Sequence, residues 1–122
     1  MAAPTVAGAK PFTGAGTPGD GAVVVWNLTS ADPVGDPVAG YEDYADRTVQ
    51  FYGTWGGATA QLQGKLSAAA GYEALSDAQG NAISKTANAL ETVLEAVPFV
   101  RAALSDAGAG ADVIAVLYVR KK

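Results

Sequence analysis

Carboxylates in two short segments come closest to a chemical motif in this chain. Asp32 and Asp36 lie in DPVGD, and Glu42, Asp43 and Asp46 follow shortly after them. Paired carboxylates can serve as general acid and base, or they can bind Ca²⁺. A calcium loop needs dense, alternating oxygen ligands, whereas DPVGD supplies two carboxylates across a proline. We therefore interpret these residues as solvent-facing loop acids and expect no metal site.

The chain contains no histidine and no cysteine, which removes most routes to catalysis. Histidine is the usual general base near neutral pH and the commonest metal ligand, and a Ser-His-Asp arrangement requires it. The segment GAGTPG (14–19) fits G-x-G-x-x-G, but it lacks the strand before and the helix after that a dinucleotide site needs. The sequence therefore predicts no catalytic residues, no enzyme activity and no cofactor.

The composition predicts a single, lightly charged domain. The chain has 122 residues and a net charge of -4, with 49% hydrophobic and 16% charged residues. Light surface charge favours the burial of some surface against a partner. The one basic cluster, Arg120-Lys121-Lys122, is too small for a nucleic-acid face. No signal peptide or membrane-spanning segment is evident, so we expect synthesis in the cytoplasm and no membrane partner.

Alternation of polar and apolar residues predicts a series of short β-strands. The expected strands are 22–28, 47–53, 58–64, 71–77, a short strand from Ile83, 99–105 and 112–120. Strands 22–28 and 112–120 are apolar on both faces, and for 112–120 this is expected of a strand in the centre of a sheet. Thr54-Trp55-Gly56-Gly57 predicts a hairpin between two of them. Gly53 and Gly64 at strand ends indicate bulges or close backbone approach.

One segment, residues 87–97, departs from the strand pattern. Its sequence is ANALETVLEAV, in which helical spacing relates Leu90, Val93, Leu94 and Val97. Asn88 with Glu91 could form an N-terminal cap. Because a proline follows directly, we expect at most a short helix.

The expected fold is all-β. About seven short strands with Gly-rich turns predict one β-sandwich, jelly-roll-like, over residues 22–122. Residues 1–21 are rich in Gly, Ala, Pro and Thr and predict a flexible N-terminal arm.

Aromatic residues supply the candidate contacts with a protein partner. Trp26 lies inside an apolar strand and is expected in the core, whereas Trp55 lies in a turn and could cover the core or contact a partner. Tyr41 and Tyr44 in YEDY are expected to pack on a neighbour, and Phe12 is the one aromatic of the arm. Phe12, Tyr41, Tyr44 and Trp55 are therefore the candidate protein-interface residues.

Several segments resemble small virion proteins of tailed bacteriophages. They are DRTVQFYGTWGGATAQLQG (46–64), DAQGNAI (77–83), FVRAALS (99–105) and VIAVLYVRKK (113–122). Together they are similar to capsid decoration (cement) proteins and to related head and tail structural proteins. The resemblance covers about residues 45–122.

The resemblance implies a β-sandwich that stabilises a phage head from outside and has no catalytic activity. The implied partners are the major capsid protein and further copies of the chain, as a homotrimer or another symmetric homo-oligomer. The implied location is the capsid surface of the virion, after synthesis in the host cytoplasm, with the arm ordering on binding. The alternative is a carbohydrate-binding or tail adsorption module of a virion, which needs exposed aromatics on one surface.

Overall fold

The computed structural model describes residues 2–8, 21–39 and 46–120, which form ten β-strands and no helix. The predicted all-β class is therefore confirmed. The strands are β1 (Thr5–Gly8), β2 (Gly21–Thr29), β3 (Val38–Ala39), β4 (Asp46–Thr54), β5 (Thr59–Lys65), β6 (Glu73–Ala74), β7 (Ser84–Lys85), β8 (Ala89–Thr92), β9 (Phe99–Ser105) and β10 (Asp112–Arg120).

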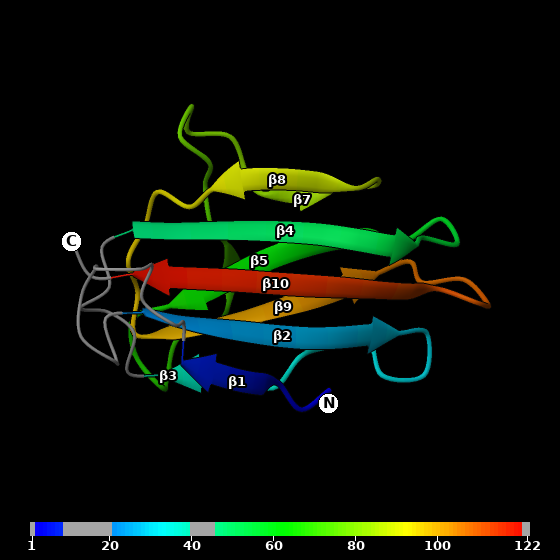
Figure 1. Ribbon diagram of the computed structural model, residues 1–122, viewed down its shortest axis with the longest axis horizontal. Coiled ribbons are helices and arrows are strands. Elements are labelled where there is room, and N and C mark those ends of the chain that lie inside the picture. The colour runs from blue at the N-terminus through cyan, green and yellow to red at the C-terminus, as the bar shows by residue number, and fades with distance from the viewer. Residues whose placement is uncertain (1, 9–20, 40–45, 121–122) are drawn as a thin grey trace.

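The strands form two antiparallel sheets that lie one over the other, in a sandwich-like arrangement (Figure 1). The front sheet, nearer the viewer, has the order β1-β2-β10-β4-β8. The back sheet has the order β3-β9-β5-β6, and β7 also pairs with β5. Strand pairs are nested along the chain: β2 pairs with β10, β3 with β9, β4 with β8, and β5 with both β6 and β7. Most strand pairs therefore join segments that are far apart in the sequence.

Apolar side chains from both sheets fill the space between them. Because side chains alternate along a strand, every second residue of β2, β4, β5 and β10 points inward. Trp26 is fully buried, as expected, and its indole N–H donates a 2.8 Å hydrogen bond to the carbonyl oxygen of Asp36. The largest fully buried side chains are Trp26, Phe51, Leu28, Leu62, Ile83, Leu117, Val24, Val49, Val100, Val113 and Val119.

The predicted hairpin between β4 and β5 is wrong, although both strands exist. β4 lies in the front sheet between β10 and β8, whereas β5 lies in the back sheet beside β9. The connection turns tightly, with a 2.8 Å bond from the Ala58 N–H to the Trp55 carbonyl and positive φ at Gly56 and Gly57. The glycines that indicated a hairpin instead allow the chain to cross between sheets.

The predicted short helix over residues 87–97 is also wrong, because this segment supplies edge strand β8 along β4. The two residues expected to cap the helix have other partners. Asn88 accepts a 2.8 Å hydrogen bond from the indole of Trp55, and Glu91 forms a 2.8 Å salt bridge with Lys85. Tertiary partners therefore override the helical spacing of the leucines and valines.

The N-terminal residues that the structure describes belong to the folded domain. Strand β1 pairs with β2 over four residues, although it lies within the predicted arm of residues 1–21. Ala2 is 5% exposed, and it donates a 2.8 Å backbone hydrogen bond to Val34 and accepts one of 2.7 Å from Asp36. The expectation of a free arm is therefore wrong for residues 2–8, because β2 offers them an unpaired edge. Residues 9–20 lie outside the described residues.

Close backbone approach at Gly53 and Gly64 is confirmed. Gly53 has a φ of +138°, and a side chain there would collide with the carbonyl oxygen of Asp112 on β10. At Gly64 a Cβ would collide with the side chains of Val97 and Leu75. At Gly53 the neighbouring backbone therefore leaves no room for a side chain, and at Gly64 two apolar side chains fill that space.

Candidate interaction surface

The outer surface of the front sheet carries apolar residues where polar ones are usual. Antiparallel sheets with one solvated face commonly alternate apolar residues inward with polar residues outward. The outward positions of β10 are instead Ile114, Val116 and Tyr118, and those of β2 include Val23 and Val25. All five are partly exposed, because no other described element packs over them (Figure 1).

Strands β4 and β8 extend this apolar surface. Tyr52 lies beside Ile114 and is 42% exposed, and Leu90 lies beside Gln50 and is 62% exposed. The remaining outward residues of the central region are uncharged and polar. We name the surface formed by Val23, Val25, Asn27, Thr48, Gln50, Tyr52, Leu90, Thr92, Ile114, Val116 and Tyr118 the front face.

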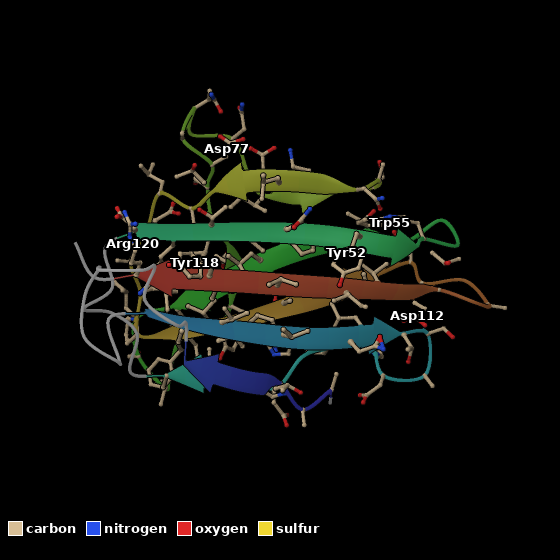
Figure 2. All side chains as sticks on the ribbon, viewed as in Figure 1. Tyr52, Trp55, Asp77, Asp112, Tyr118 and Arg120 are labelled. Atoms are coloured by element: carbon tan, nitrogen blue, oxygen red, sulfur yellow. The ribbon has the colours of Figure 1, made fainter. Side chains whose placement is uncertain are left out.

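Among the described residues on the outer side of the front sheet, charged side chains lie only next to the two ends of β10 (Figure 2). Asp112 begins the strand at one end. Arg120 ends it at the other, where its guanidinium lies 3.1 Å from the carboxylate of Asp46 on β4. A hollow of about 310 Å³ lies at this second end and is lined in part by Tyr118. Asp46 is the one acidic residue of its lining and already pairs with Arg120, which leaves the hollow poorly suited to acid–base chemistry.

The outer surface of the back sheet is chemically different. Arg101 donates a 2.8 Å hydrogen bond from Nε to Gln63, whose amide donates 2.9 Å to Gln61. The Arg101 guanidinium also lies 4.0 Å from the ring centroid of Tyr72, and the Lys65 ammonium lies 4.6 Å from it. Charged and amide groups thus cover this surface and satisfy one another, so it resembles an ordinary solvated face.

The Tyr72 hydroxyl is shielded from solvent and has no hydrogen-bond partner among the described residues. Desolvation raises the pKa of Tyr72 above its ordinary value of about 10, although the positive charge of Arg101 acts in the opposite direction. The cations around its ring reduce the aromatic surface on which a sugar could stack.

Trp55 is the one predicted interface residue that the structure describes. Its indole packs partly buried against the core cluster, and its N–H bonds to Asn88 within the chain. Trp55 therefore covers the core, and contact of its exposed edge with a partner stays a prediction. Phe12, Tyr41 and Tyr44 lie outside the described residues.

The carboxylate segments are only partly described. Asp32 takes part in a turn with Thr29, whose hydroxyl and carbonyl both accept its backbone N–H. Within residues 2–8, 21–39 and 46–120, no three acidic side chains are grouped so as to hold a metal ion. Glu42 and Asp43 lie outside the described residues.

Sequence reasoning did not identify the front face, although the signal was present. Strands 22–28 and 112–120 are apolar on both faces, which predicted a central strand for 112–120, and β10 is indeed the middle strand of its sheet. A central position explains only the inward residues. The outward valines, isoleucine and tyrosine need a second cover that the described chain does not provide.

The chain matches no protein-family model, and comparisons with curated proteins and with solved structures also give no match. Among the described residues, no helix has the length and apolar character needed to cross a bilayer.

Proposed function

We propose that this chain is a non-enzymatic structural subunit of a phage virion, which binds the outer surface of the capsid and stabilises it as a symmetric homo-oligomer. The observation that carries the assembly role is the front face, an apolar sheet surface without cover from the described residues. Contiguous apolar patches of this kind mark protein contacts, because exposing them to water is unfavourable. The major capsid protein is the proposed partner on the particle.

The nested strand order supports this proposal. Pairing of β2 with β10, β3 with β9, β4 with β8 and β5 with β7 is the order expected when one long hairpin wraps into two sheets. We assign this order to a jelly roll, an architecture used by viral capsid and lectin domains. Because fold alone does not define function, the lectin use supports a sugar-binding module equally, and the argument for a protein partner rests on the front face.

The chemistry of the front face favours a protein partner over a sugar. Tyr52 is its most exposed aromatic, and its neighbours across the strands are Ile114 on β10 and then Asn27 on β2. A sugar site combines a stacking ring with several convergent polar groups. The front face instead has seven aliphatic or tyrosine side chains, four uncharged polar ones and charges only at its ends, a composition typical of a protein interface.

The proposal is tested on capsids assembled without this chain. Purified protein is added, and the temperature at which the capsids release their DNA is compared with that of untreated capsids. We expect a higher release temperature and co-sedimentation of the protein with capsids. An unrelated protein of similar mass and charge provides the control, and equal behaviour of the two proteins would refute the proposal.

The sugar-binding alternative predicts a different result. A glycan array probed with the wild type and with Tyr52→Ala would show a signal that depends on this ring. The virion-structural proposal predicts no glycan signal above background for either protein.

A further inference from the structure

We propose that two copies of this chain pack front face to front face around a two-fold axis that passes close to Val116. The proposal rests on the proposed function, because it names the first partner of the surface that carries that function. A homodimer with this symmetry is isologous: the same patch is used twice, and each contact occurs in duplicate.

The position of Val116 suits a symmetry axis. It is the middle residue of the nine in β10, and its neighbours are Val25 on β2 and Gln50 on β4. A two-fold axis that lies in the interface, parallel to the two sheets and perpendicular to β10, would place β10 of each copy antiparallel to its counterpart. Sheets that pack face to face keep their strands within about 30° of each other, which such an arrangement permits.

The charges of β10 are complementary to their own reversed copy. Asp112 lies at one end of the outward row and Arg120 at the other (Figure 2). The uncharged Ile114, Val116 and Tyr118 lie between them along the strand. Antiparallel packing brings the Asp112 of each copy toward the Arg120 of the other. Within the chain, Arg120 also pairs with Asp46. Because both side chains are well exposed, this salt bridge is weak and does not prevent Arg120 from pairing with Asp112 of the second copy.

The size of the front face reaches the lower bound for a specific dimer. Strands β2, β4 and β10 have nine residues and are about 30 Å long, and β8 has four, so strands about 4.8 Å apart give a footprint of roughly 500 Å² per copy. The pair would bury about 1,000 Å², the size that a specific interface should reach. Aliphatic and tyrosine side chains in its centre, with charges at its rim, match the usual anatomy of such interfaces.

Two charge-reversed variants test the orientation directly. Asp112→Arg has arginine at both ends of the row, and Arg120→Asp has aspartate at both ends. Each variant alone would bring like charges together twice, so we expect its dimer to weaken by roughly a hundredfold. Mixed in equal amounts, they would form a heterodimer in which both contacts are again opposite charges. Native mass spectrometry distinguishes the three species by mass.

A variant at the axis tests the surface. Val116→Lys would place two ammonium groups opposite each other, and we expect it to be monomeric in analytical ultracentrifugation. Val116→Thr retains the β-branched shape, and Gln61→Lys adds the same charge to the outer surface of the back sheet, so both should remain dimeric. Circular dichroism checks that all variants are folded.

A monomeric or trimeric wild type, a dimer that Val116→Lys leaves intact, or charge-reversed variants that do not pair when mixed would each overturn the inference. These outcomes are separate from the test on capsids. Wild-type protein that stabilises capsids but stays monomeric would contradict the dimer and leave the proposed function in place. A dimer that does not stabilise capsids would contradict the proposed function and leave the dimer in place.

Discussion

The indole N–H of Trp55 donates a 2.8 Å hydrogen bond to Oδ1 of Asn88, thirty-three positions further along the chain. The same oxygen accepts the backbone N–H of Gly53 at 3.3 Å. One amide therefore joins the end of β4, the crossing between the sheets and the start of β8. This arrangement explains why Asn88 does not cap a helix and why Trp55 lies against the core.

Removal of either partner of this bond should destabilise the domain. Trp55→Phe and Asn88→Ala should each lower the free energy of unfolding by about 1 kcal/mol. The double variant should lose less than the sum, with a coupling of about 0.5–1.5 kcal/mol. Urea unfolding monitored by circular dichroism measures all three. Strict additivity would show that the two side chains do not interact.

Gly35 should tolerate no side chain, because it lies against the core tryptophan. A Cβ at Gly35 would lie 2.8 Å from both the indole nitrogen of Trp26 and the carbonyl oxygen of Ala102. We expect Gly35→Ala to cost about 1–3 kcal/mol through overpacking. Gly71→Ala is the matched control, because nothing lies within 4 Å of its added Cβ. Equal melting temperatures for the two variants would contradict the close packing of residues 33–36 on Trp26.

The exposures of Val93 and Leu94, which directly follow strand β8, differ from those expected in the helix that the sequence predicts. Val93 is 4% exposed and Leu94 is 62% exposed. Val93→Ala should therefore lower stability by about 1–3 kcal/mol, whereas Leu94→Ala should change it by less than about 0.5 kcal/mol. In the predicted helix both residues would lie on the buried stripe. Comparable losses in chemical denaturation would favour that helix.

Tyr72→Phe should stabilise the domain, most strongly at alkaline pH. The substitution removes a shielded hydroxyl without a described partner and keeps the ring between its cations, so a gain of up to about 1 kcal/mol is expected near neutral pH. Desolvation raises the pKa of Tyr72 in the folded state above about 10, so the unfolded chain releases this proton first. Wild-type stability should therefore fall as the pH rises above 10.

The measurement is urea unfolding of the wild type and of Tyr72→Phe between pH 8 and pH 11. The advantage of the variant should grow with pH above the ordinary tyrosine pKa. An advantage that shrinks over this range would mean that the folded state prefers the ionised hydroxyl.

Local pattern predicts much of the strand content of this chain. The expected strands 99–105 and 112–120 coincide with β9 and β10, because alternation is a property of neighbouring residues. Glycine and asparagine in Gln79-Gly80-Asn81 are likewise typical of a turn, and the structure has a turn there. Oδ1 of Asp77 accepts the backbone N–H groups of Gln79 and Asn81, each at 3.0 Å.

Which strands pair with each other could not be predicted from the local sequence pattern. The Trp55-Gly56-Gly57 turn fits a hairpin as well as a crossing between sheets, and the hairpin is excluded because β10 and β8 occupy the two edges of β4. The free edge of β2 likewise recruits residues 5–8, whose composition indicates an arm. Both outcomes depend on strands far away in the sequence, which single-segment patterns do not contain.

The candidate site was predictable only in its parts. The sequence indicates that β2 and β10 are apolar on both sides, but which side lacks cover depends on the arrangement of the two sheets. The same arrangement brings Tyr52 beside Ile114 and separates Asp112 from Arg120 along one strand. Of the predicted contact residues, Trp55 has an internal role that the turn composition did not distinguish from an external one.

Cryo-electron microscopy of assembled virions containing this chain tests the central claim most directly. The account predicts density for the two-sheet domain on the outer surface of the capsid, in copies related by symmetry, with the front face covered by protein. A map in which the domain is absent from the capsid exterior, or in which the front face of every copy is open to solvent, would contradict the account.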